Sequence, residues 1–117
     1  MTYETTDADL RRWQARDARA LVTLLEEGYR NGLPPLRWSV GAGGGLVGDA
    51  DGMTARVAGQ RAAFDAWADY LGAARWRERT NSAGITHLHA LFTWQADDRV
   101  KGAIRADLFP ADGSEPA

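Results

Sequence analysis

The stretch THLHALFTWQADDRVKGAIRADLF, residues 86–109, contains two runs of alternating apolar and polar side chains separated by a short acidic segment. A period of two with β-branched and aromatic residues is typical of strands, so the stretch predicts a β-hairpin. One face of the two runs carries the apolar or small side chains, namely Leu88, Ala90, Phe92, Trp94, Val100, Gly102, Ile104, Ala106 and Leu108.

The register of this hairpin follows from parity, because directly opposed residues on paired strands share one face of the sheet. A two-residue turn at Asp97–Asp98 would place Trp94 opposite Lys101 and mix apolar with charged side chains. A three-residue loop at Ala96–Asp98 pairs Trp94 with Val100 and keeps the apolar side chains together. A slip by one residue would turn one strand inside out, so the register should be firmly specified.

The other face of the hairpin is polar. The same register places His87 opposite Asp107 and His89 opposite Arg105. A loop shifted by one residue at each end keeps the parity and brings Asp107 opposite His89 instead. Both alternatives put the two histidines on the face away from the core.

The composition fits one domain of 117 residues with a net charge of −2 and no cysteine. The lack of cysteine excludes disulfides, thiolate metal sites and a cysteine nucleophile. The small net charge gives no general attraction to nucleic acid or acidic lipid. The polar start MTYETTDADL has no signal-peptide pattern and no apolar run reaches membrane length, so we expect a cytoplasmic protein without membrane association.

A first helix is expected from about Asp7 to Asn31, with Thr6 or Asp7 as its cap and Asn31–Gly32 as its stop. Its apolar face is expected to carry Ala18, Leu21, Val22, Leu25 and Tyr29, with Leu10, Trp13 and Leu24 beside it.

The stretch LRWSVGAGGGLVGDA, residues 36–50, predicts a second hairpin in which Val40 pairs with Leu46. Its glycine run lacks the spacing and the Lys-Ser/Thr pair of a phosphate loop. A second helix is expected over Met53–Ala73, capped by Asp51. Its apolar stripe is expected to comprise Val57, Phe64, Trp67, Ala68 and Leu71.

These elements give the order α-β-β-α-β-β and an α+β fold. Each helix has one apolar stripe and each strand one apolar face, so two layers suffice. We expect a four-stranded, mostly antiparallel sheet with both helices on one face. Residues 1–109 should form this single domain, with residues 74–84 as a polar connector, and residues 110–117 a disordered tail.

His87 and His89 are two residues apart on an expected strand, so both imidazoles project from one face. This spacing would suit two metal ligands, with Asp107 as a third ligand or an outer partner. The H-x-H pattern has low specificity and the chain has no second cluster of such residues. We therefore favour an exposed strand face with a cross-strand His–Asp pair, and no metal site.

The segment Arg75-Trp76-Arg77-Glu78-Arg79 interleaves cations with an indole. Nucleic-acid surfaces use arginine for phosphates and aromatic rings for base stacking. The alternative is a solvated connector whose tryptophan packs back on the core. The net acidic chain favours that alternative, because nucleic-acid binding normally needs a basic field.

Arg12, Arg16 and Arg19 line one side of the first helix in its N-terminal half, where positive charge opposes the helix dipole. Positive charge that opposes the helix dipole without an evident compensating contact marks a candidate surface for an anion or an acidic partner. A solvated face is the simpler interpretation.

The stretches LPPLRWSV (33–40), RAAFDAWADYLGA (61–73) and GITHLHAL (84–91) together resemble small uncharacterised proteins of actinobacterial genomes, prophages and mobile elements. The resemblance spans residues 33–108, and no activity is known for that group. It implies an accessory protein that binds components of the host or of the element.

No motif specifies a chemistry, so we expect a small non-catalytic binding protein without a cofactor, acting through protein–protein contacts as a homodimer. Five tryptophans, a small-residue face on the second helix and an uncovered sheet face support this interpretation. The alternative is nucleic-acid binding through the Arg75–Arg79 segment and the arginines of the first helix. A metal-dependent enzyme at His87 and His89 is less favoured. Arg105 and Asp107 complete the candidate binding residues.

Overall fold

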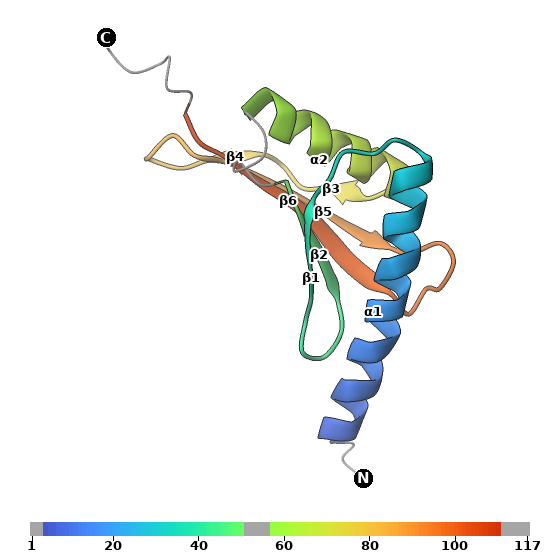
Figure 1. The fold of residues 1–117 in the computed structure, drawn as a ribbon. Coiled ribbons are helices and arrows are strands. Elements are labelled where there is room, and N and C mark those ends of the chain that lie inside the picture. The colour runs from blue at the N-terminus through green and yellow to red at the C-terminus, as the bar shows by residue number, and fades with distance from the viewer. Residues whose placement is uncertain (1–3, 51–56, 111–117) are drawn as a thin grey trace.

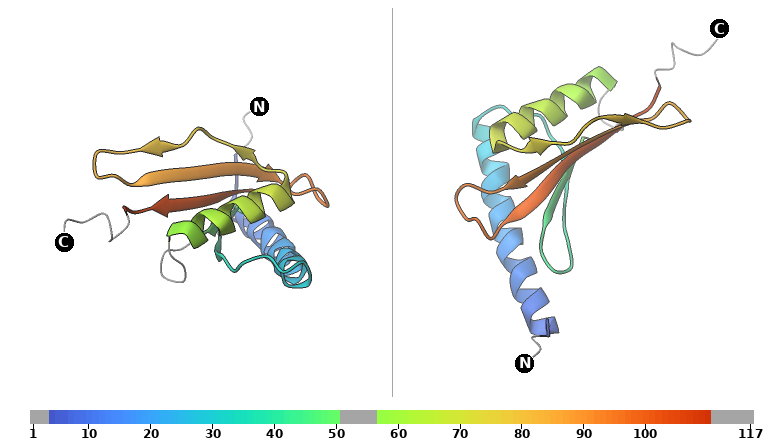
Figure 2. Two further views of the ribbon diagram at one scale, coloured as in Figure 1. Left: turned by 90° about the horizontal axis from the view of Figure 1, so that it is seen from above. Right: turned by 180° about the vertical axis from the view of Figure 1, so that it is seen from behind.

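The computed structural model describes residues 4–50 and 57–110 and shows a mixed α+β fold. A single sheet is covered on one face by two helices, and its other face is open (Figures 1 and 2). In order, the elements are α1 (Asp7–Arg30), β1 (Arg37–Val40), β2 (Leu46–Asp49), α2 (Val57–Leu71), β3 (Ala74–Arg75), β4 (Arg79–Thr80), β5 (Thr86–Thr93) and β6 (Lys101–Leu108). Neither helix, over the described ranges, has the length and apolar character needed to cross a membrane.

Helix α1 begins where the sequence predicts, and Thr6 rather than Asp7 is its cap. The Thr6 hydroxyl accepts a hydrogen bond from the Asp9 amide, and the Asp9 carboxylate accepts one from the Thr6 amide, both at 3.1 Å. This reciprocal pair satisfies two amides that the helix itself leaves without partners. The helix ends at Arg30, and Gly32 follows with a φ of 67°.

The expected apolar face of α1 is only in part the buried one, because Leu21 packs against the core and Leu24, expected beside that face, is fully buried. The residues of α1 that are buried are Asp17, Ala20, Leu24 and Gly28. The apolar residues Val22, Leu25 and Tyr29 are instead 58%, 46% and 89% exposed. Hydrophobic periodicity does not count an aspartate and a glycine as core positions, so it selected the neighbouring stripe.

The register of both hairpins is confirmed. In β5–β6, Phe92 lies opposite Gly102, and the Trp94 amide donates to the Val100 carbonyl at 2.8 Å. In β1–β2, Val40 pairs with Leu46 as expected. The apolar side chains of β5 and β6 lie in the core under the helices, so parity correctly identified the covered face.

The expected four-stranded sheet is wrong, because the described residues form a sheet of six strands in the order β1-β2-β6-β5-β3, with β4 also paired to β5. All pairs are antiparallel except β2–β6. The expected connector, residues 74–84, contains β3 and β4, which lie along the outer edge of β5. Between them, the Trp76 amide donates to the His89 carbonyl at 2.8 Å. Strands of two residues are too short to produce an alternation in the sequence.

Helix α2 buries Phe64, Trp67 and Ala68 as the sequence predicts. The Trp67 indole packs edge-on against Trp38, with 5.2 Å between ring centroids, and its N–H donates to the Pro34 carbonyl at 2.6 Å. Trp67 thereby joins α2, β1 and the segment after α1. The expected helix start and cap in residues 51–56, and residues 111–117 of the expected tail, lie outside the described residues.

Candidate functional site

A cleft of about 550 Å³ lies on the open face of the sheet. Strands β4, β5 and β6 and the segment between β3 and β4 form its walls. The residues that line it are Trp76, Arg77, Arg79, His87, Leu88, His89, Arg105 and Asp107. The fold thus joins the histidine pair and the arginine–tryptophan segment, which the sequence treats as separate candidates, into one site.

Strand pairing explains this convergence. The hairpin register places His87 opposite Asp107 and His89 opposite Arg105, so the shifted alternative is wrong. On the other side of β5, Arg79 pairs with His87. The segment expected to be a polar connector is therefore held beside the histidines by backbone hydrogen bonds.

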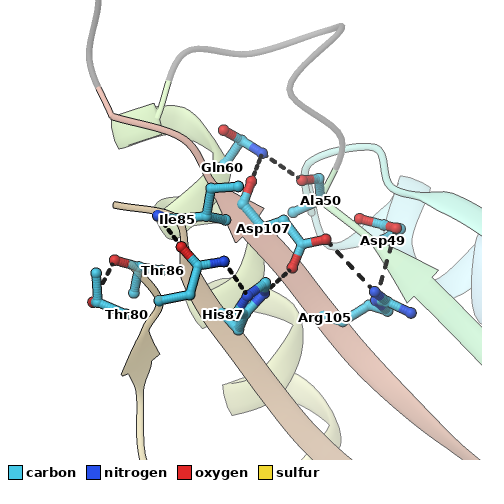
Figure 3. A network of polar contacts seen from close by, with 10 residues as sticks. Asp49, Ala50, Gln60, Thr80, Ile85, Thr86, His87, Arg105 and Asp107 are labelled. Carbon is cyan, nitrogen blue, oxygen red and sulfur yellow. Dashed lines mark hydrogen bonds and ion pairs between the residues drawn. The ribbon is translucent and has the colours of Figure 1, made fainter. Parts of the chain in front are cut away.

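The polar floor of the cleft centres on Asp107 (Figure 3). One carboxylate oxygen of Asp107 lies 2.7 Å from Nδ1 of His87, and the other lies 3.6 Å from Nη2 of Arg105. Arg105 also approaches Asp49 at 3.9 Å from Nε. A carboxylate bonded to Nδ1 fixes the orientation of the imidazole and leaves Nε2 for other partners.

His89 and Trp76 form the aromatic wall. Their ring centroids are 4.3 Å apart with planes inclined by 38°. Burial, and secondarily the positive charge of Arg105, lowers the pKa of His89 below its ordinary value, which favours the neutral imidazole. The Trp76 side chain is 58% exposed, so the expectation that it packs back on the core is wrong.

The cleft is positively charged although the chain is acidic overall. The side chains of Arg77 and Arg79 make no hydrogen bond or ion pair with any residue that the structure describes. Glu78, between them in sequence, is held by Arg61 through two hydrogen bonds of 2.8 and 3.1 Å. Three guanidinium groups therefore line the cleft against the single carboxylate of Asp107. Such a surface favours an anionic ligand.

Arg75 belongs to the candidate segment but not to the cleft. Its guanidinium lies 2.7 Å from an Asp69 carboxylate oxygen and 3.5 Å from Asp65, and it lies over the Phe64 ring. These partners belong to α2, on the covered face of the sheet. Alternation along an edge strand directs Arg75 and Trp76 to opposite faces.

The arginines of α1 lie apart from the cleft. Arg12 pairs with Asp9 in the first turn. Arg16 donates from Nε to Asp17 at 2.8 Å and from Nη2 to the Arg99 carbonyl at 3.2 Å. Arg19 is exposed and lines no part of the cleft. Two of the three arginines are therefore engaged in structural contacts.

Asn81 is a site residue that sequence reasoning missed. Its side-chain oxygen accepts from the Ala83 and Ile85 amides at 2.9 and 3.0 Å and shapes the turn between β4 and β5. Its amide nitrogen lies 3.5 Å from Nε2 of His87. The turn sequence NSAG was the available signal, since asparagine commonly bonds its own backbone in turns.

The arrangement offers a stacking surface, cations and two imidazoles, and not a metal-ligand set. Over residues 4–50 and 57–110, no three or more histidine, cysteine, aspartate or glutamate side chains are grouped so that they could hold a metal ion. The metal-dependent alternative thus gains no support from the geometry. No protein-family model, curated protein or solved structure matches the chain.

Proposed function

We propose that this protein binds single-stranded nucleic acid in the cleft on the open sheet face. The observation that carries the proposal is an exposed indole, Trp76, beside two guanidinium groups, of Arg77 and Arg79, that have no partner among the residues the structure describes. An aromatic face stacks on a base, and each stacked base contributes about 1–3 kcal/mol. Arginines that have no protein partner are available for phosphates. The proposal favours the nucleic-acid alternative over the protein–protein role expected from sequence alone.

The cleft favours a single strand over a duplex. Bases in a duplex are stacked on one another, and an indole in a cleft cannot reach their faces. A single strand can turn a base out onto Trp76 while its phosphates meet Arg77 and Arg79. A volume of about 550 Å³ is suited to a ligand portion of roughly nucleotide size.

The test is fluorescence anisotropy with labelled single-stranded RNA and DNA of roughly ten nucleotides, a length typical of single-strand sites. We expect binding that weakens between about 50 and 200 mM salt. Two phosphate contacts, from Arg77 and Arg79, give a log–log slope of about −1.4 for a single strand. A matched duplex should bind more weakly. Absence of binding to either single strand at low salt would overturn the proposal.

Three variants locate the site. Trp76→Ala should weaken binding by about 5–150-fold, the equivalent of one lost stacking contact. Arg77→Ala should reduce the steepness of the salt slope by about 0.7. Arg19→Ala removes an exposed arginine from α1 and should change neither value. Equal losses for Arg19→Ala and Arg77→Ala would place the contact outside the cleft.

A second candidate function is self-association through α1. Val22, Leu25 and Tyr29 form an exposed apolar stripe that no described element covers, and Glu26 and Arg30 border it. A two-fold interface places the same patch on both copies, so it must be self-complementary. An antiparallel pair of α1 helices can set Glu26 of one copy against Arg30 of the other, twice. This charge pattern favours a second copy as the occupant.

Sedimentation velocity at micromolar concentration tests this candidate. We expect a dimer for the wild type and a monomer for Leu25→Asp, because the substitution buries a charge in the centre of the apolar stripe. Leu91→Asp, at a leucine that is equally exposed but lies on the open sheet face, is the control and should remain dimeric. A monomeric wild type would contradict the candidate.

A further inference from the structure

The cleft holds two imidazoles in an arrangement that binding alone does not require. His87 and His89 project from one face of β5, two residues apart. With a rise of about 3.3 Å per residue, their points of attachment are roughly 6.6 Å apart. That spacing allows two imidazoles to reach opposite sides of a single phosphodiester group. Arg105, directly opposite His89, places a guanidinium beside the same space.

The surroundings of the two histidines differ. The Asp107 carboxylate, 2.7 Å from Nδ1, orients the His87 ring, and Nε2, which lies 3.5 Å from the Asn81 amide nitrogen, is left as the exchanging atom. His89 has no carboxylate partner among the described residues, and it lies between Trp76 and the positively charged Arg105. The two imidazoles therefore differ in their contacts, so one can serve as the acid and the other as the base.

We propose that the cleft cleaves the RNA strands it binds, an inference that rests on the proposed nucleic-acid function. His89 accepts the proton of a ribose 2′-hydroxyl, and the 2′-oxygen bonds to the adjacent phosphorus. The bond from phosphorus to the 5′-oxygen breaks, and His87 donates its proton to that leaving oxygen. The products are a 2′,3′-cyclic phosphate and a 5′-hydroxyl, so atoms and protons balance without a co-reactant.

The remaining residues of the cleft support this reaction. Negative charge develops on the phosphorane oxygens, and Arg105, Arg77 and Arg79 are the donors in reach of them. Asp107 acts as a positioning residue, because it touches His87 and not the reacting atoms. Trp76 holds the base next to the scissile phosphate. This activity differs from the non-catalytic role expected from sequence alone.

The test compares three labelled strands of one sequence: RNA, DNA, and DNA with a single ribonucleotide. We expect all three to bind, the RNA to be cut, the DNA to stay intact, and the third strand to be cut only after its ribonucleotide. Mass spectrometry should find the 2′,3′-cyclic phosphate. Binding without cleavage would overturn the catalytic inference and leave the proposed function standing. Failure of all three strands to bind would overturn both.

Variants separate the histidines from a contaminating nuclease and from simple loss of fold. His87→Asn keeps a side-chain N–H for Asp107, and His89→Gln keeps a polar side chain beside Trp76. Each should reduce cleavage by about 10²–10⁴-fold at protein concentrations that keep the RNA strand bound. Unchanged cleavage in both variants would overturn the inference.

The role of Asp107 has its own readout. Asp107→Asn should lower the cleavage rate in the wild-type background but cost little further in a His87→Asn background, because Asp107 acts through His87. Equal losses of rate in both backgrounds would contradict the positioning role.

Discussion

The Trp67 indole occupies the space that a side chain at Gly28 would need. A methyl group placed on Gly28 would lie 2.8 Å from Cζ2 of the Trp67 ring, which is closer than real contacts allow. Gly28 belongs to α1 and Trp67 to α2, so this contact sets how closely the two helices approach. The hydrogen bond from Trp67 to the Pro34 carbonyl limits the freedom of the indole to move away.

Gly28→Ala should therefore destabilise the fold by about 1–3 kcal/mol, even though alanine is the better helix former by about 1 kcal/mol. Urea melts measure the change in free energy of unfolding. In a Trp67→Phe background the smaller ring leaves room, and the same substitution should cost much less. If Gly28→Ala raises stability in both backgrounds, the contact does not limit helix packing.

The contrast between α1 and the hairpin shows what the sequence can predict. In β5–β6, eight-residue strands with apolar side chains at alternate positions leave one acceptable parity, so register and buried face were both correct. In α1, the buried stripe contains Asp17 and Gly28, which stay buried because of specific partners elsewhere in the chain. Hydrophobic periodicity does not take those partners into account, so it predicted a stripe that is in fact mostly exposed.

The candidate site shows the same limit. The sequence identified nearly every residue that lines the cleft, but in two separate groups. Their union depends on the pairing of two-residue strands with the edge of β5, a long-range event with no local periodic signal. The sequence did not show that Arg75 and Trp76 lie on opposite faces of the sheet. That conclusion requires the segment to be a strand, in which neighbouring side chains project to opposite faces.

Asp17 provides the second prediction, since its nearly fully buried carboxylate joins α1 to the β1–β2 loop. It accepts a hydrogen bond from the Gly45 amide at 2.6 Å and another from Nε of Arg16 at 2.8 Å. Asp17→Ala removes both acceptors and should lower the free energy of unfolding by about 1–3 kcal/mol. Asp17→Asn keeps one acceptor oxygen and should cost less. Equal urea midpoints for Asp17→Ala and the wild type would contradict this role.

The third prediction compares neighbours on opposite faces of β5. Phe92 is buried in the core, whereas Leu91 is 46% exposed on the open face. Phe92→Ala should cost about 3–5 kcal/mol through the lost contacts and the cavity, enough to unfold a marginal domain. Leu91→Ala should stay within about 0.5 kcal/mol. Circular dichroism during urea melts measures both, and a larger cost at Leu91 would mean that the covered face is assigned wrongly.

The fourth prediction concerns the protonation of His89. Burial is the main reason that its pKa is lowered, and the charge of Arg105 is the lesser one. In an NMR titration, His89 should therefore titrate below about 6.5, the ordinary value for histidine. Trp76→Ala uncovers the imidazole and should raise the pKa of His89. Arg105→Ala should raise it by a smaller amount, because it removes only the lesser cause.

The lowered pKa of His89 also determines whether the stability of the fold rises or falls with pH. Between the lowered pKa of folded His89 and about 6.5, the unfolded chain binds more protons than the folded protein does. Stability therefore rises with pH through this window, is complete above about 6.5, and is lost as the pH falls towards the folded-state pKa. His89→Gln should remove this contribution, so its urea midpoint should change less between pH 7 and pH 5 than that of the wild type. If the urea midpoints of both proteins change equally between pH 7 and pH 5, His89 is not the group responsible for the pH dependence of stability. The inference that folded His89 is neutral in the cleft would then lose this support.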